Sequence, residues 1–198
     1  EAINNHLDDV RLKDTFGRLH NYLQKTQKRS LDHLQKVKVY QLQDFMKIDL
    51  YSKRNLELTE TIRSKGKKGS LLWLLDETKT AMGARMLKQW IDRPLLSKNE
   101  IKSRLQMVQS LLDHYFERED LRERLKEVYD LERLAGRVAF GNVNARDLIQ
   151  LKKSLQQVPA IKEVITSVKD NQINEKTEQI DTCTELTDLL DSALVENP

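Results

Sequence analysis

Cysteine, glycine and proline are all scarce in this sequence. Its 198 residues include one cysteine, six glycines and three prolines. The single cysteine, Cys183, excludes an internal disulfide and is typical of a reducing compartment, so we expect a cytoplasmic location. With so few glycines and prolines, the sequence has little of the turn chemistry on which sheet proteins depend.

Long apolar runs and a strong charge of one sign are also lacking. The longest apolar run, Leu71 to Leu75, is far shorter than the roughly 20 residues that span a bilayer, so no membrane partner is expected. No signal peptide opens the chain. The net charge of +3 is too small to indicate a nucleic-acid partner by itself. The chain starts at Glu1 rather than at methionine, and we therefore expect a piece of a longer protein.

Helix-forming residues dominate what is present. Hydrophobic residues make up 38% and charged residues 33% of the chain, a balance typical of a globular helical protein. Leu, Lys, Glu, Arg and Gln are abundant, and all of them are good helix formers. We predict an all-α fold, a bundle-like core of several helices. At most one short strand is expected, near residues 37–45, where β-branched and aromatic residues partly alternate.

The central stretch from Ser70 to Leu95 predicts two helices. Ser70 can cap the first and Thr80 the second, and Pro94 ends the second because the residue before a proline avoids helical angles. Gly83 lies inside the second helix, and we expect another backbone to approach it closely. We expect this stretch to be a buried hub. The apolar face of its second helix consists of Met82, Met86, Leu87, Trp90 and Ile91.

Apolar periodicity predicts further helices on both sides of this stretch. One runs from Lys13 to Lys28, and another from Leu50 to about Thr61 after a capping Asp49. A capping box, Ser97-x-x-Glu100, opens the next helix. Its stripe, expected to be buried, is Ile101, Leu105, Val108, Leu112 and Tyr115. The last two helices are predicted at residues 144–159, capped by Asn144 and ended by Pro159, and at residues 175–194.

A basic loop, residues 63–70, precedes the central stretch. It carries four basic side chains and two glycines, but it does not match the Gly-x-x-x-x-Gly-Lys-Ser/Thr phosphate loop. The pattern favours a solvated turn between helices. A DNA-contacting loop is the alternative that stays open. In that case the contacts would be Arg63, Lys65, Lys67 and Lys68.

Convergent catalytic or metal-binding motifs are not found in the sequence. It holds no His-Glu-x-x-His, Cys-x-x-Cys, Gly-x-Ser-x-Gly or Rossmann glycine pattern. We therefore expect no catalytic, cofactor-binding or metal-ligating residue. Arg85 and Arg133 are embedded among apolar residues, and each is expected to pair with a nearby carboxylate rather than with phosphate. The predicted last helix has an acidic face, interpreted as solvated: Glu178, Asp181, Glu185 and Asp188.

A spaced pattern in the central stretch resembles the core (lever) domain of MutS DNA mismatch repair proteins, closest to the bacterial type. Its members here are Asp76, Thr78, Thr80, Gly83, Arg85, Trp90 and Pro94. Flanking segments follow in the family's order, with Asn55 and Glu57 before, and Glu132, Arg133, Arg146 and Asp147 after. By this resemblance, residues 1–14 end a connector or linker and residues 15–198 form the first part of the core domain. The mismatch-binding, clamp and ATPase domains would lie outside this sequence.

The resemblance implies a structural role for this chain. The longer protein is expected to be a homodimer that binds mismatched double-stranded DNA, binds ATP with Mg, hydrolyses ATP and recruits a MutL-type partner. This piece would link the DNA-binding and ATPase parts, with no cofactor and no activity of its own, because neither a Walker A motif nor the Phe-x-Glu mismatch motif is in the sequence. Two alternatives remain. The chain is either an autonomous helical module that binds nucleic acid or a protein-docking scaffold that uses its acidic last helix.

Overall fold

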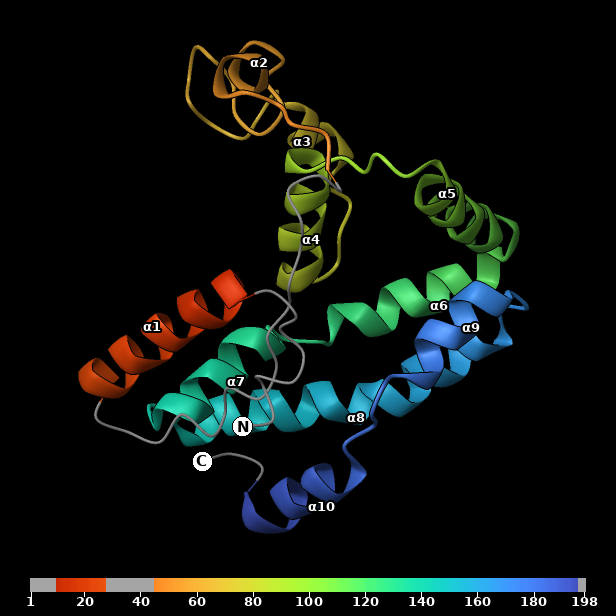
Figure 1. Cartoon of the computed structure of the whole chain (residues 1–198). Coiled ribbons are helices and arrows are strands. Elements are labelled where there is room, and N and C mark those ends of the chain that lie inside the picture. Colours follow the sequence, from red (N-terminus) through yellow and green to blue (C-terminus); the bar gives the residue numbers. More distant parts are fainter. Residues whose placement is uncertain (1–9, 28–44, 196–198) are drawn as a thin grey trace. The chain divides into compact units, whose positions relative to one another are not determined.

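A computed structural model describes residues 10–27 and 45–195 (Figure 1). The chain divides into two compact units, residues 1–42 and residues 43–198, and each is described by itself. Helices account for the regular structure of the described residues, which confirms the all-α prediction. Residues 37–44 of the expected strand lie outside the described residues, and Phe45 forms only an isolated antiparallel bridge with Leu95. The predicted domain division after residue 14 stays a prediction.

From α3 onward the helices follow one another with short connections, whereas residues 56–70 separate α2 from α3. The first unit holds α1 (Val10–Gln27). The second holds α2 (Leu50–Asn55), α3 (Leu71–Leu75), α4 (Ala81–Asp92), α5 (Lys98–Asp113), α6 (Tyr115–Lys126), α7 (Leu131–Phe140), α8 (Ala145–Ser167), α9 (Asn171–Glu178) and α10 (Thr184–Ala193). No helix of the described part is long and apolar enough to cross a membrane.

The five side-chain caps that the sequence predicts start α2, α3, α4, α5 and α8. Each predicted cap accepts a hydrogen bond from a backbone N–H of the first helical turn, which would otherwise have no partner within the helix. At the start of α8, Asn144 and Asp147 form a reciprocal capping box. The confirmed caps are Asp49, Ser70, Thr80, Ser97 and Asn144.

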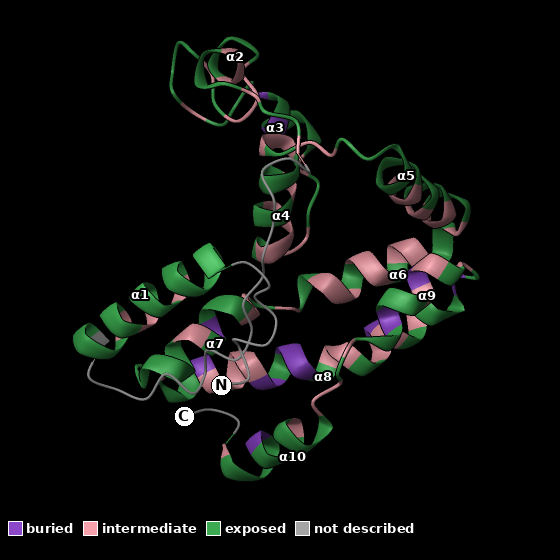
Figure 2. Ribbon diagram, viewed as in Figure 1, coloured by how far each residue is buried: buried purple, intermediate pink, exposed green. Residues whose placement is uncertain are grey.

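The core of the second unit is built around the long helix α8. Helices α6, α7, α9 and α10 all contact α8. Figure 2 shows buried segments in purple at intervals along α8. Ser154 of α8 is fully buried, and its hydroxyl accepts from the Tyr129 amide at 2.9 Å and donates to the Gln150 carbonyl at 2.8 Å. The apolar core residues are Leu72, Leu134, Leu155, Ile161, Val168, Ile173 and Leu190.

Two helix predictions for the second half of the chain are wrong. Helix α8 passes through Pro159 and ends at Ser167. A proline inside a helix removes one hydrogen bond, but buried side chains on both sides of it, Leu155 and Ile161, hold the helix in the core. The predicted helix 175–194 is two helices, α9 and α10, because Cys183 adopts a left-handed backbone with φ 49°. The four acidic residues of its expected single face therefore belong to α9, α10 and the link between them.

The expected burial of the central stretch is also wrong. Of its apolar side chains only Leu72 is buried, whereas Trp73 is 49%, Met86 55% and Trp90 43% exposed. The stripe expected to be buried on α5 is exposed as well, up to 62% at Leu105. The 3.6-residue period is real, but period alone does not say whether a second element covers the face that it creates. In the described residues these faces of α4 and α5 are left open.

Two glycines of α7 give a matched test of this local structure. Gly141 caps the helix with φ 68°, a conformation in which a Cβ costs about 1–2 kcal/mol. Gly136 lies inside α7, and a Cβ there would meet no other atom within 4 Å. We expect Gly141→Ala to lower the free energy of unfolding by about 1 kcal/mol, and Gly136→Ala to raise it by a similar amount. Urea denaturation measures both, and shifts of the same sign would contradict this assignment.

Candidate functional site

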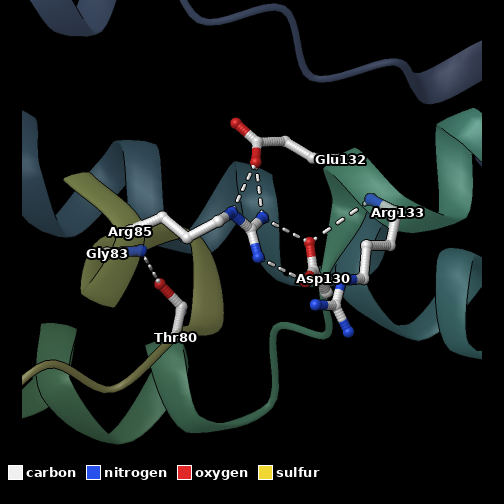
Figure 3. A network of polar contacts seen from close by, with 6 residues as sticks. All are labelled: Thr80, Gly83, Arg85, Asp130, Glu132 and Arg133. Atoms are coloured by element: carbon white, nitrogen blue, oxygen red, sulfur yellow. Dashed lines mark hydrogen bonds and ion pairs between the residues drawn. The ribbon is translucent and has the colours of Figure 1, made fainter. Parts of the chain in front are cut away.

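One arginine joins two segments that lie far apart in the sequence. Arg85 extends from α4 toward the start of α7, where the carboxylates of Asp130 and Glu132 accept its hydrogen bonds (Figure 3). Its two terminal nitrogens donate to the two oxygens of Asp130, both at 2.7 Å. Its Nε donates to Glu132 Oε2 at 3.0 Å, and Nη2 also contacts that oxygen. We call this arrangement the Arg85 fork. It confirms the predicted ion pair.

The local sequence places both halves of the Arg85 fork. Thr80 caps α4 and so sets the helical phase at which Arg85 leaves it. Asp130 caps α7 by accepting from the Arg133 amide at 3.3 Å, which holds its carboxylate at the helix start. Arg133 itself is 78% exposed and makes a looser ion pair with Asp130 at 3.4 Å, which confirms the second predicted pair. Asp130 therefore serves as cap and as ion-pair partner at once.

The Arg85 fork shifts the titration of its members. Hydrogen bonding to Arg85 is the largest cause that lowers the pKa of Asp130 from its usual 3.8 to about 2. The same bonds, led by that from Asp130, raise the pKa of Arg85 above its ordinary value. The Asp130 side chain is only 17% exposed, so this pair is less screened by solvent than the Glu132 contact, where the carboxylate is 68% exposed.

Gly83 is crowded, but not by another backbone, so the expectation of a close backbone approach is wrong. A Cβ at this position would lie 3.1 Å from the Thr80 hydroxyl and 3.4 Å from Thr78 Cβ. The Thr80 hydroxyl accepts from the Gly83 amide at 3.0 Å. Glycine thus leaves room for the cap of its own helix.

The other residues of the central pattern also make contacts within this unit. Asp76 accepts from the Thr78 hydroxyl at 2.6 Å and pairs with Lys67, whose hydrogen bond is the largest cause that lowers the pKa of Asp76. The Trp90 ring lies under the guanidinium of Arg104, with 3.8 Å between the guanidinium carbon and the ring centroid. The Pro94 carbonyl accepts from the Met46 amide at 2.8 Å.

Two of the residues that flank the central pattern, Glu57 and Asp147, also make contacts within this unit. Glu57 has φ 48°, and its carboxylate accepts from the Ile62 amide at 2.7 Å, which ends α2 at Asn55 rather than at the predicted Thr61. Asp147 is buried and accepts from Arg137 Nη1 at 2.5 Å. Arg146, next to Asp147, is exposed.

The predicted basic loop is a turn held by its own hydrogen bonds. The Thr61 amide donates to the Gly66 carbonyl at 2.9 Å, and the Lys65 amide to the Thr61 carbonyl at 3.0 Å. Of the four predicted DNA contacts, Lys67 pairs with Asp76. Arg63, Lys65 and Lys68 are exposed.

A groove that the sequence did not predict lies between α4 and α5. It encloses about 780 Å³. Its lining includes Met86, Trp90, Met107 and Leu111, with Arg104 at the Trp90 ring. The apolar period was visible in the sequence, but nothing local indicated that the two faces would enclose an open groove. Among the described residues, no group of three His, Cys, Asp or Glu side chains could hold a metal ion.

Comparisons with known proteins match this amino-acid sequence to one family. Residues 52–198 match the family described as MutS domain III. The chain is 71% identical over 193 residues to the DNA mismatch repair protein MutS of Bacillus velezensis, covering 98% of this chain and 22% of that protein. It is 68% identical over 193 residues to MutS of Bacillus subtilis, with the same coverage. It is 66% identical over 192 residues to MutS of a Geobacillus strain, covering 97% of this chain and 22% of that protein.

The Arg85 fork predicts a specific pH dependence of stability. The folded-state pKa of Asp130 lies below its unfolded value, so its contribution is complete above about pH 4 and is lost as pH falls toward 2. Arg85→Ala should therefore lower stability at pH 7, and the difference from the unchanged chain should shrink between pH 4 and pH 2. Urea denaturation at steps between pH 2 and pH 7 measures it. If the difference in stability stayed constant across this range, the Arg85 fork would not be the cause of the pH dependence.

Proposed function

This chain belongs to the MutS family of DNA mismatch repair proteins, and we propose that it is the structural module that links the DNA-binding and ATPase parts of such a protein. The chain spans about a fifth of the length of the curated relatives it matches. For the whole protein, the proposal includes a homodimer in the cytoplasm that binds mismatched double-stranded DNA, ATP and Mg, and a MutL-type partner.

The observation that carries this proposal is the Arg85 fork. A bidentate pair between a guanidinium and a carboxylate fixes both distance and orientation, which a single point contact does not. It connects residues 45 positions apart, from α4 to the cap of α7. Because Asp130 is also that cap, a displacement of α4 would act on the first turn of α7 directly.

Further polar links continue from the Arg85 fork in both directions. Toward α2, Lys53 pairs with Asp92 at 3.0 Å, tying α2 to the end of α4. Toward the core, Arg137 of α7 pairs with Asp147 of α8. Lys152 of α8, almost fully buried, pairs with Asp191 of α10 at 3.1 Å. Contiguous packed and ion-paired elements of this kind are the physical means by which two distant sites can be coupled.

The polar side chains in these links pair with one another between helices or cap helix starts. Asp147 illustrates this, because one carboxylate closes a capping box and an ion pair at the same time. Such an arrangement supports a linking role for this chain, with nucleotide chemistry proposed for other parts of the protein.

Arg85→Ala in the full-length protein tests the proposal. We expect ATP affinity to stay within about twofold, while stimulation of ATP hydrolysis by mismatched DNA falls by about fivefold, the lower end of typical coupling energies. The reason is that the variant removes the link between α4 and α7 and leaves the nucleotide contacts untouched. Nucleotide titration and steady-state ATPase assays with and without DNA measure the two quantities.

Arg133→Ala is the matched control. It removes a guanidinium from the same site, but one that is exposed and loosely paired, so DNA stimulation should be retained. Equal losses of ATP affinity and DNA stimulation in Arg85→Ala would indicate general misfolding instead of coupling. Unchanged stimulation in that variant would reject the linking role of the Arg85 fork.

A further inference from the structure

The turn at residues 61–69, here called the basic turn, presents its cations on a fixed frame. Besides the two backbone bonds that close it, the Thr61 and Ser64 hydroxyls lie 2.5 Å apart, and the Ser70 hydroxyl donates to the Lys67 carbonyl at 2.6 Å. Ser70 is only 1% exposed and caps α3, so the end of the turn is anchored at the start of that helix. Lys65 has φ 50°, a costly backbone conformation for a residue other than glycine.

This frame sorts the basic side chains into two groups. Lys67 belongs to the frame, because it pairs with Asp76 at the end of α3. Arg63, Lys65 and Lys68 are exposed, and within the described residues none of the three makes an ion pair. Arg54 of α2 lines the same hollow as Lys65, a space of about 300 Å³ that Glu60 also lines. Cations held on a fixed backbone lose less entropy on binding than cations on a free loop.

The composition of the basic turn favours phosphate over a protein surface. Protein interfaces are anchored by apolar and aromatic side chains in a desolvated centre. From Arg63 to Gly69 every side chain is basic, a hydroxyl or hydrogen. Phosphate backbones, by contrast, are held by lysine, arginine, serine and backbone N–H groups. The acidic side chains of α9 and α10 would repel the same polyanion, which favours contact at the basic turn over contact at those two helices.

We propose that the basic turn contacts the phosphate backbone of duplex DNA through Arg63, Lys65 and Lys68, with Arg54 beside them and Lys67 as a structural residue. This deepens the proposed function and rests on it only in assigning the longer protein to DNA repair. The contact carries no sequence information, because phosphates are the same at every base pair. It therefore adds affinity for matched and mismatched duplexes equally.

The experiment compares two triple variants of the full-length protein. Arg63→Gln, Lys65→Gln and Lys68→Gln together remove the three turn cations. The control, Lys88→Gln, Lys102→Gln and Lys153→Gln, removes three exposed lysines of α4, α5 and α8 and gives the same net charge. Affinity for a 40-base-pair matched duplex and a mismatched one is measured by fluorescence anisotropy across a salt series. Thermal melting confirms that both variants are folded.

The turn variant should reduce the slope of log K against log salt by about 3, since each lost phosphate contact accounts for about 0.9. The control slope should change by less than about 1. Affinity for both duplexes should fall by the same factor. Equal slopes in the two variants would overturn the proposal, as would a loss confined to the mismatched duplex. Competition by polyglutamate as effective as that by DNA would instead assign the turn to an acidic protein.

Lys67→Gln separates the frame from the contact. It should lower the melting temperature through loss of the ion pair with Asp76. The slope of log K against log salt should change by less than about 1, the value of one phosphate contact. A slope change as large as that of the triple variant would overturn the assignment of Lys67. These readouts need no ATP. If the DNA contact of the basic turn is disproved, the result on coupling through Arg85 is therefore unaffected. If the coupling is disproved, the comparison of salt slopes is likewise unaffected.

Discussion

A guanidinium held between two carboxylates is the constraint that ties α4 to the helices around α8. Arg85 can meet Asp130 with two parallel bonds only when α4 and the first turn of α7 keep one distance and one orientation. Capping makes this possible at both ends, because Thr80 fixes the start of α4 and Asp130 fixes the start of α7. The same carboxylate thus determines a helix boundary and a tertiary contact, two levels of structure that are usually set by different residues.

Polar contacts position the segment from α2 to α5, whereas apolar burial organises the helices around α8. Buried apolar side chains gather around α8, whereas the segment from α2 to α5 has Leu72 as its one buried apolar residue among those described. In that segment position is set by ion pairs, backbone bonds and caps, such as the pair of Lys53 with Asp92 and the bond from the Leu71 amide to the Glu57 carbonyl. Such links fix the relative orientation of the helices but contribute little to the free energy of unfolding when they are exposed. This agrees better with the proposed linking role than with an autonomous core.

Local chemistry could be predicted from the sequence and tertiary coverage could not. Caps depend on one side chain and the next three amides, and the five caps that were predicted are confirmed, as is the pairing of Arg85 with a carboxylate. The cap Asp130 was not predicted. The end of α8 beyond Pro159 and the break at Cys183 depend on packing and on one left-handed residue, neither of which periodicity reports. Gly83 shows the same limit, since its crowding comes from Thr80 three residues earlier and sequence could not assign it to the cap.

The exposed apolar stripe of α5 offers a way to tell substitutions that disturb folding from substitutions that disturb a contact with another part of the protein. Leu105 is 62% exposed, and substitutions at exposed positions usually change stability by less than about 0.5 kcal/mol. A polar residue there would leave this unit folded, in contrast to the same change at Leu155 in the core. In the proposed full-length protein, a missense variant at Leu105 that abolished activity with normal protein abundance would thus indicate a contact made by this helix. Variants that lower abundance would map to the surroundings of α8.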